Sequence, residues 1–190
     1  NEGLVIETKL TNLASQEGVT FELLVIDSAS TDDTVQRIKR WLENHPNAFA
    51  NHEFIEMEHR LGKSKAVQLA LESLEAKGYD GLICMTDADA SVPANALKRL
   101  QGWFANPTVG AVGASARRSG GLEQEQVHRS MFELLREGES AHDSTPFLEG
   151  SLMMWRSSSF SASQINIGSN ADDAQIATQV RLNGLRSIHD

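Results

Sequence analysis

Short apolar runs alternate with amphipathic segments through the first 115 residues, and this alternation limits the possible folds more than any other feature of the chain. The apolar runs predict strands at residues 21–27, 53–57, 80–86 and 109–114. The segments with helical spacing of apolar residues predict helices at residues 4–15, 33–44, 63–77 and 93–104. Strands and helices that alternate in this way are typical of an α/β domain with a mostly parallel central sheet flanked by helices.

The rest of the chain is less regular. It predicts a helix at about residues 122–138, a strand at 151–155, and a last helix at 172–183 that Gly184 ends. The 190 residues contain no internal repeat and no interdomain linker, and this length suits one domain with its own core. We therefore expect a single domain over residues 1–190.

Charge and apolar content exclude two broad classes of function for this segment. The net charge of −9 and the sequence pI of about 5.1 argue against nucleic-acid binding, which needs a basic surface. No apolar run approaches the roughly 20 residues that a membrane-spanning helix needs, and no signal peptide is visible. The single cysteine, Cys84, lies in an apolar run, so we expect a small buried hydrophobic side chain rather than a reactive thiol.

Two carboxylates, Asp87 and Asp89, directly follow the predicted strand at residues 80–86. In a turn, carboxylates two residues apart can converge on one hard cation, and Mg²⁺ or Mn²⁺ takes such oxygen ligands together with phosphate oxygens. An isolated Asp-x-Asp is more often a solvated loop, here with a helix cap near Ser91. The position directly after an apolar strand favours the metal site.

Two further segments offer groups for a nucleotide. Asp27 ends the predicted strand at 21–27, where a carboxylate can accept hydrogen bonds from a base or a ribose. Arg60, Gly62 and Lys63 precede or begin a predicted helix, whose N-terminus can hold an anion or can simply be an exposed basic helix start. A P-loop is excluded, because the first glycine of that motif is replaced by Met57.

Asp172 and Asp173 begin the last predicted helix. Acidic residues in a first turn stabilise the helix dipole, and that effect alone explains them. Alternatively, one of the two carboxylates points into a cleft and acts as a general base. Trp155, at the end of the strand at 151–155, is either a core residue or a wall on which a sugar stacks.

Taken in order, these segments resemble the family 2 glycosyltransferases, which have the GT-A fold. Residues 25–34 resemble the family's Val-Val-Asp-Asp-Gly-Ser-Thr-Asp-x-Thr segment, with Ser28 and Ala29 in place of its second Asp and its Gly. Residues 1–2 resemble the end of the family's Pro-x-Tyr-Asn-Glu opening, and residues 87–89 resemble its metal-binding Asp-x-Asp motif. The resemblance covers essentially the whole chain.

The resemblance implies a role for each candidate residue. It implies that six residues contact the donor: Glu2, Asp27, Arg60, Gly62, Lys63 and Asp87. It also implies that Asp89, together with Asp87, binds Mg²⁺ or Mn²⁺. On the acceptor side it implies Gly150, Asp172 and Trp155, with Asp173 as the catalytic base. Residues 1–115 would then form the nucleotide-sugar-binding half of the domain and residues 116–190 the acceptor-side half.

The resemblance also implies the reaction. It is inverting transfer of a sugar from a nucleotide-diphosphate donor, usually a UDP-sugar, to a hydroxyl of a saccharide or lipid-linked acceptor. Residues 93–190 most resemble the membrane-integrated branch that includes cellulose-, hyaluronan- and chitin-synthase-like enzymes. We therefore expect a first strand and a C-terminal part outside this chain, with membrane helices that hold the parent protein at the cytoplasmic face of a membrane.

Two other functions remain open at this point. A haloacid-dehalogenase-like phosphatase also uses Asp-x-Asp after a strand, with the first Asp as nucleophile, but that motif normally opens the domain and three strands precede it here. A nucleotide-sugar-binding module without turnover is the second alternative. The presence of Asp87, Asp89 and Asp173 argues against that module.

Overall fold

The computed structural model describes residues 1–114, 134–169 and 171–190. Five helices have defined bounds: α1 (Ile6–Ala14), α2 (Thr34–Asn44), α3 (Lys63–Ala76), α4 (Ala96–Trp103) and α6 (Asp172–Leu182). Six strands lie between and after them: β1 (Glu22–Asp27), β2 (Asn51–Glu56), β3 (Leu82–Thr86), β4 (Val109–Gly113), β5 (Leu152–Arg156) and β6 (Arg186–His189). The predicted α/β class is confirmed.

Most predicted elements are present within one to three residues of their expected bounds. The predicted helix at 122–138 lies mostly outside the described residues; the part from 134 onward is helical and continues to 142. The predicted loop at 157–169 contains two short 3₁₀ helices, η1 (Ser157–Ser159) and η2 (Ala162–Gln164). We did not predict β6, because its Arg-Ser-Ile-His sequence has no strand pattern and its burial depends on pairing with β4 and on packing against distant residues.

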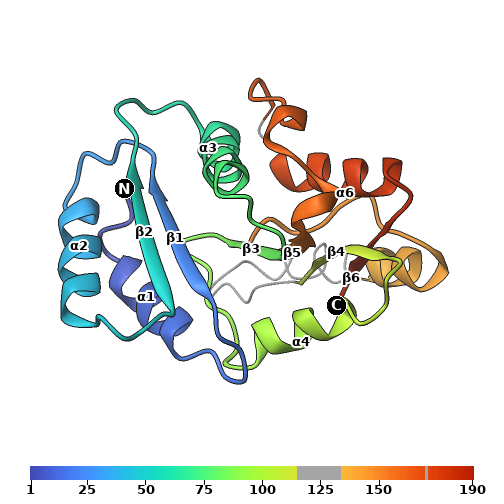
Figure 1. Cartoon of the computed structure of the whole chain (residues 1–190), viewed down its shortest axis with the longest axis horizontal. Helices are drawn as coiled ribbons and strands as arrows, with labels where there is room; N and C mark the ends of the chain where they lie inside the picture. Colours follow the sequence, from blue (N-terminus) through green and yellow to red (C-terminus); the bar gives the residue numbers. More distant parts are fainter. Residues whose placement is uncertain (115–133, 170) are drawn as a thin grey trace, which may run out of the picture.

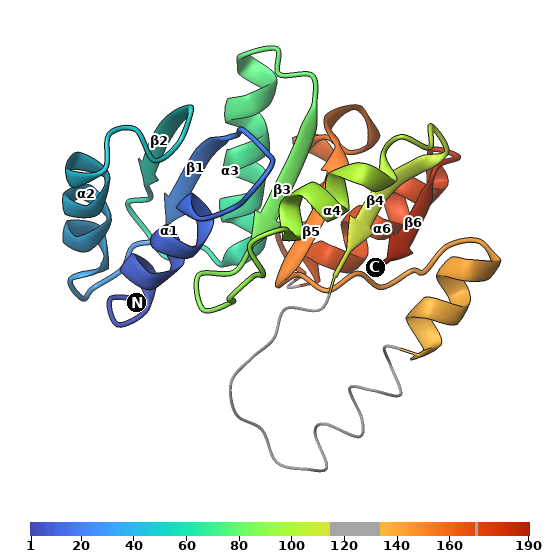
Figure 2. The same ribbon diagram turned by 90° about the horizontal axis from the view of Figure 1, so that it is seen from below.

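The strands lie between two layers of helices (Figures 1 and 2). On one face, α3 and α6 pack against β4 and β5 through a cluster that includes Leu71, Trp155 and Ile176. On the other face, α4 and the end of α1 pack against the same strands through Leu100 and Leu13. Helices α1 and α2 cover β1 and β2. Within the described residues, no helix has the length and apolarity needed to cross a bilayer.

The strands form two hydrogen-bonded sheets rather than one. Strands β1 and β2 make a parallel pair, and the other four are ordered β3-β5-β4-β6. In the second sheet β5 runs antiparallel to both of its neighbours, and β4 runs parallel to β6. The expectation of a mostly parallel sheet is therefore wrong in detail. Of the four strand pairings in the two sheets, two are parallel and two are antiparallel. Both antiparallel pairings involve β5, which starts at the carboxyl end of β3 and runs back along it.

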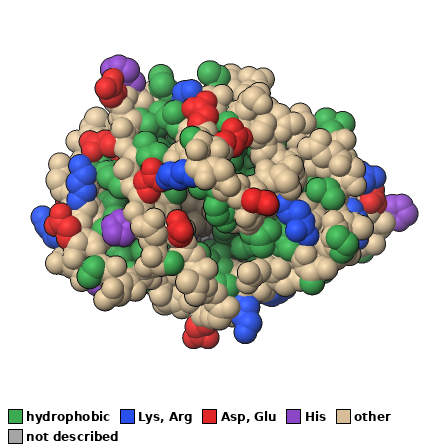
Figure 3. Space-filling view, viewed as in Figure 1, with side chains coloured by type: hydrophobic (Ala, Val, Ile, Leu, Met, Phe, Trp, Pro, Cys, Tyr) green, Lys and Arg blue, Asp and Glu red, His purple; other side chains and the backbone are tan. Residues whose placement is uncertain are grey.

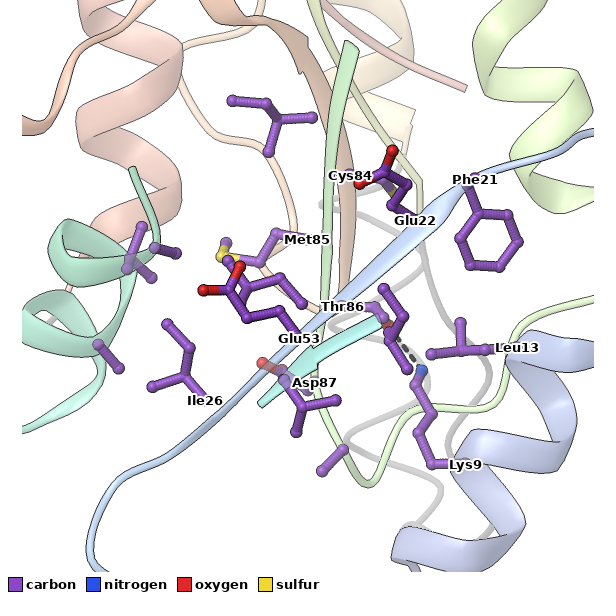
Figure 4. Close-up of a pocket in the computed structure, with 18 of the residues that line it drawn as sticks. Lys9, Leu13, Phe21, Glu22, Ile26, Glu53, Cys84, Met85, Thr86 and Asp87 are labelled. Carbon is purple, nitrogen blue, oxygen red and sulfur yellow. Dashed lines mark hydrogen bonds between the residues drawn. The ribbon is translucent and has the colours of Figure 1, made fainter. Parts of the chain in front are cut away.

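An apolar cavity of about 1190 Å³ separates β1 from β3. Side chains of both strands line it, and α1 and α3 enclose it with residues that include Leu10, Leu13, Val67 and Leu71 (Figure 4). On the molecular surface, hydrophobic side chains are visible at the bottom of a central hollow (Figure 3). The middle of β1 is therefore only half-buried, although its sequence is apolar.

The cavity also corrects our expectation for Cys84. The side chain borders the cavity and is exposed there, rather than packed within the core. The cavity walls around the thiol are nevertheless apolar. This burial among apolar groups raises the pKa of the Cys84 thiol from 9.0 to about 12, although the charge of Lys9 acts to lower it. The thiol is therefore protonated at neutral pH, which agrees with the expected lack of reactivity.

Candidate functional site

The turn after β3 carries the first pair of predicted site residues. Asp87 follows the last residue of the strand, and a backbone hydrogen bond from Ala90 N–H to the Asp87 carbonyl closes the turn around Asp89. One carboxylate oxygen of Asp87 accepts a hydrogen bond from Lys63 Nζ at 2.8 Å. The Asp89 side chain is exposed. The turn thus presents one carboxylate to α3 and one to solvent.

Lys63 joins this turn to the last helix. Besides its bond to Asp87, its Nζ lies 3.6 Å from Asp172 Oδ2 at the start of α6. Burial acts to lower the pKa of Lys63, but the hydrogen bond to Asp87 and the charges of Asp172 and Asp173 outweigh burial and raise it above 10.5. The ammonium group is therefore held as a cation among acidic groups from two distant parts of the sequence.

The two aspartates of α6 differ in their surroundings. Asp172 is 2% exposed, and among the described residues its Oδ2 accepts no hydrogen bond, although the Lys63 ammonium lies 3.6 Å away. Burial raises the pKa of this carboxyl above its usual value, although Lys63 acts in the opposite direction. Asp173 is half-buried and accepts two backbone hydrogen bonds, from Gly150 N–H at 3.2 Å and from Ala174 N–H at 2.8 Å. Asp173 is therefore the more accessible carboxylate and is held in a fixed orientation.

Gly150 lets these groups approach one another. A Cβ atom at this position would lie 3.1 Å from Lys63 Nζ and 3.3 Å from Asp173 Oδ2, closer than most Cβ contacts. A side chain here would therefore push the ammonium and the carboxylate apart. This close approach gives Gly150 a physical role beside Asp173.

Asp27 organises a second turn, at the end of β1. The carboxylate is 5% exposed, and its Oδ2 accepts a hydrogen bond from Ser30 N–H at 2.7 Å. Between them Ala29 has a φ of +56°, in the left-handed region that favours glycine. The amino terminus of Asn1 donates to Ser30 Oγ, and Glu2 N–H donates to Thr34 Oγ1. Glu2 and Asp27 therefore belong to the same corner of the molecule.

The remaining donor-side predictions lie in the loop before α3. Gly62 caps this helix with a φ of +88° and a ψ of 167°, a backbone conformation that is essentially restricted to glycine. Arg60 is exposed and lines the same cavity as Asp27, Lys63 and Asp87. The structure therefore brings five of the six predicted donor residues to the lining of one hollow, and Gly62 lies next to Lys63 in the chain.

Trp155 borders the apolar cavity but lies away from the carboxyl ends of the strands, where the predicted site residues gather. Its side chain is 1% exposed and packs in the core. In the antiparallel register, Leu152 lies opposite Thr86 at the end of β3, whereas Trp155 lies opposite Ile83, three residues further from the turn. The predicted sugar-stacking wall is therefore wrong, and the alternative of a core residue is confirmed.

Lys9 belongs beside this site, and we did not predict it. Its Nζ donates to Thr86 Oγ1 at 2.7 Å and to the Ala90 carbonyl at 2.6 Å (Figure 4 shows the first bond). Burial lowers the pKa of Lys9 to about 8, although Cys84, Asp87 and Asp89 act to raise it. The available signal was a lysine on the same helix face as Ile6 and Leu13, where an apolar residue is expected.

Comparison with family models identifies one match. The model described as Glycosyl transferase family 2 matches residues 1–163. Among curated proteins, the poly-beta-1,6-N-acetyl-D-glucosamine synthase of Staphylococcus epidermidis is 26% identical over 118 residues, which cover 62% of this chain and 26% of the synthase. The chain thus spans about a quarter of the length of that relative.

Solved structures give a longer match. The mannosyltransferase PcManGT of Pyrobaculum calidifontis, solved with GDP-mannose and Mn²⁺, is 32% identical with a TM-score of 0.85. The match covers all of this chain and 52% of that enzyme. The glucosyl-3-phosphoglycerate synthase of Mycobacterium tuberculosis is 18% identical with a TM-score of 0.58, covering 100% of this chain and 65% of that one, and shows a likeness of fold alone.

Proposed function

The chain belongs to glycosyl transferase family 2 and has the GT-A fold, and from this we propose that it transfers a sugar from a nucleoside-diphosphate donor to a hydroxyl acceptor with inversion at the anomeric carbon. The observation that carries this proposal is the contact of Lys63 with Asp87 and Asp172, which joins the donor-side turn to the first turn of α6. The family match favours this reaction over the phosphatase alternative.

We assign the donor to the rim of the hollow where β1 and β3 end, next to Asp27 and Asp87. Asp27 accepts hydrogen bonds from the base or ribose, and Glu2 lies at the same corner. Arg60, the backbone at Gly62, and Lys63 face the diphosphate, because cationic side chains and a helix N-terminus both stabilise anions. The base is uridine by our sequence-based expectation, whereas the mannosyltransferase of P. calidifontis holds GDP-mannose. Assays of donor binding and of transfer should therefore compare the UDP- and GDP-linked forms of the same sugar.

We propose that Asp87 and Asp89 hold Mg²⁺ or Mn²⁺ together with the donor. Within the described residues, no three His, Cys, Asp or Glu side chains group closely enough to hold a metal ion alone. That arrangement suits a metal bound by one or two carboxylates plus substrate phosphates. The donor set fits a hard cation, since Asp87 and Asp89 offer carboxylate oxygens from one turn and Asp87 already contacts the Lys63 ammonium. Such an ion supplies charge neutralisation for a departing diphosphate.

We propose that Asp173 is the general base. Two backbone N–H groups orient its carboxylate, which remains half-buried rather than sealed in the core. Asp173 takes the proton of the acceptor hydroxyl as that oxygen bonds to the anomeric carbon, and the bond from that carbon to the diphosphate breaks on the opposite face. Asp172, beside it, holds Lys63 and lines the acceptor side with Gly150.

The acceptor and the cellular setting follow from resemblance alone. We propose a saccharide or lipid-linked acceptor, which the name of the S. epidermidis synthase supports. We also propose that a longer parent protein works at the cytoplasmic face of a membrane, as in the membrane-integrated branch that residues 93–190 resemble. Residues 1–115 and 116–190 then divide the domain into donor and acceptor halves.

An Asp173→Asn variant tests the proposal. We expect donor binding to persist and transfer to fall by about 10²- to 10⁴-fold, the usual contribution of a general base. Asp80→Asn, an exposed aspartate outside the site, is the matched control. Transfer is measured with Mn²⁺ and UDP- or GDP-sugars, and product stereochemistry by NMR. Full turnover in Asp173→Asn removes the base assignment, and donor binding without any transfer by the wild type indicates a binding module.

A further inference from the structure

A row of polar side chains on α1 faces the segment that carries Asp87 and Asp89. We call Lys9, Asn12 and Gln16 the polar stripe of α1; they follow one another at spacings of three and four residues and so lie on one face. Gln16 lies just after the helix ends at Ala14. Each of the three bonds to the chain between Thr86 and Leu97, so the stripe contacts the whole connection from β3 to α4.

Lys9 clamps the turn at both sides of the two aspartates. The lysine is 5% exposed, and its Nζ donates to Thr86 Oγ1 before Asp87 and to the Ala90 carbonyl after Asp89. Ala90 is itself 2% exposed, so water has little access to this carbonyl. Because a buried carbonyl without a hydrogen bond destabilises the folded state, the bond from Lys9 fixes the place where the turn ends.

Asn12 and Gln16 continue this contact beyond the turn. Asn12 makes two bonds with the backbone of Val92, donating to its carbonyl at 2.8 Å and accepting from its N–H at 3.0 Å. Gln16 donates to the Pro93 carbonyl at 2.9 Å and accepts from Leu97 N–H at 3.2 Å. The backbone that follows Asp89 is therefore held to α1 at four further points.

The clamp also reaches the acceptor side. Thr86 Oγ1 accepts from Lys9 and donates to the Ser151 carbonyl at 2.7 Å. Ser151 follows Gly150, whose N–H holds Asp173. A continuous set of hydrogen bonds and chain connections thus leads from Lys9 to the proposed base.

We propose that Lys9 is a positioning residue that fixes Asp87 and Asp89 in the geometry needed to bind a divalent cation. The inference rests on the proposed function, because the cation belongs to that function. Lys9 acts through the turn: the two carboxylates bind the ion, and the hydrogen bonds from Lys9 fix the position of the backbone that carries them. A polar group that orients a metal ligand typically changes metal affinity 10- to 100-fold when it is lost.

The sign of the effect distinguishes positioning from simple charge. A positive charge beneath the turn repels a cation, so its removal without any movement of the carboxylates tightens metal binding. Loss of positioning has the opposite effect, because the carboxylates no longer converge. Weaker binding in a Lys9→Met variant, which removes the ammonium group and keeps an unbranched side chain one atom shorter, therefore supports the clamp.

The experiment titrates Mn²⁺ into the wild-type chain and into Lys9→Met, with free Mn²⁺ read by electron paramagnetic resonance. We expect a 10- to 100-fold higher dissociation constant for Lys9→Met and partial recovery in Lys9→Arg, which keeps donor groups. Lys39→Met, at an exposed ion pair between α2 and Glu56 of β2, is the matched control and retains wild-type affinity. Unchanged or tighter binding in Lys9→Met overturns the proposal.

Amide exchange in the metal-free protein separates this proposal from the proposed function. We expect residues 86–92 to exchange faster in Lys9→Met, with β6 and α6 unchanged. A wild-type chain that binds no Mn²⁺ contradicts the proposed metal site, yet the exchange of 86–92 still tests the clamp. Should Lys9→Met not fold, Thr86→Val removes one of the two contacts from the other side, and wild-type exchange in that variant overturns the clamp.

Discussion

The backbone N–H of Gly150 donates to Asp173 Oδ2 at 3.2 Å, so the loop before β5 holds a carboxylate in the first turn of α6. These two residues are 23 positions apart in the sequence, and Lys63 from α3 lies against both. A glycine is required at this point because the space for a Cβ atom is already shared by Lys63 and Asp173.

A Gly150→Ala variant is expected to lose transfer activity by roughly tenfold or more, because even a small misplacement of a catalytic group is costly. The added Cβ displaces Asp173 Oδ2 and Lys63 Nζ, which are ends of flexible side chains, so the melting temperature should change little. Gly102→Ala is the matched control, since nothing lies within 4 Å of a Cβ there. Its activity should equal wild type, and a larger loss in Gly102→Ala than in Gly150→Ala contradicts the argument.

An Ala29→Gly variant is expected to be more stable than the wild type by about 1 kcal/mol. The left-handed backbone at Ala29 destabilises the folded state by roughly 1–2 kcal/mol, and glycine avoids this strain. Glycine also has more conformational freedom in the unfolded chain, and this offsets part of the gain. Thermal unfolding should show a rise of about 2–4 °C. Ala70→Gly, inside α3, is the control and should lower stability by about 1 kcal/mol.

The order of elements and the ends of two strands could be predicted from the sequence, because both depend on local patterns. Asp27 ends β1 and Asp87 follows β3, as the apolar runs before them indicated. The failures concern contacts between distant segments. The direction of β5, which takes Trp155 away from the site, depends on its pairing with β3, and the role of Lys9 depends on the backbone 81 residues further along.

Alkylation of Cys84 is expected to be slow at neutral pH and to accelerate steeply in alkali. Only the thiolate reacts, and a pKa of about 12 leaves roughly one part in 10⁴ ionised at pH 8, against about one in ten for a thiol with a pKa of 9.0. The rate constant for iodoacetamide should therefore rise about tenfold per pH unit from pH 8 to 11. Mass spectrometry gives the rate directly, as the chain has one cysteine. A plateau near pH 9 contradicts the raised pKa.

The space between β1 and β3 has the properties of a slot for one more strand. Each of these strands is paired on one side only within the described residues, and the slot between them is apolar and covered by α1 and α3. The amino group of Asn1 donates to Ser30 Oγ, just beyond the carboxyl end of β1. A segment joined to Asn1 and lying in the slot would therefore run parallel to β1, which has six residues.

A six-residue apolar segment of valine and isoleucine fused ahead of Asn1 is consequently expected to fill the slot. Such a segment spans about 20 Å and can pair with the backbones of both β1 and β3. We expect a higher melting temperature and slower alkylation of Cys84, whose side chain borders the slot. The control is a fusion of equal length with proline at its second and fourth positions, because proline cannot donate to a sheet. Equal alkylation rates in the two fusions would mean that the hollow does not accept a strand, and hydrophobic burial alone would then account for any gain in stability.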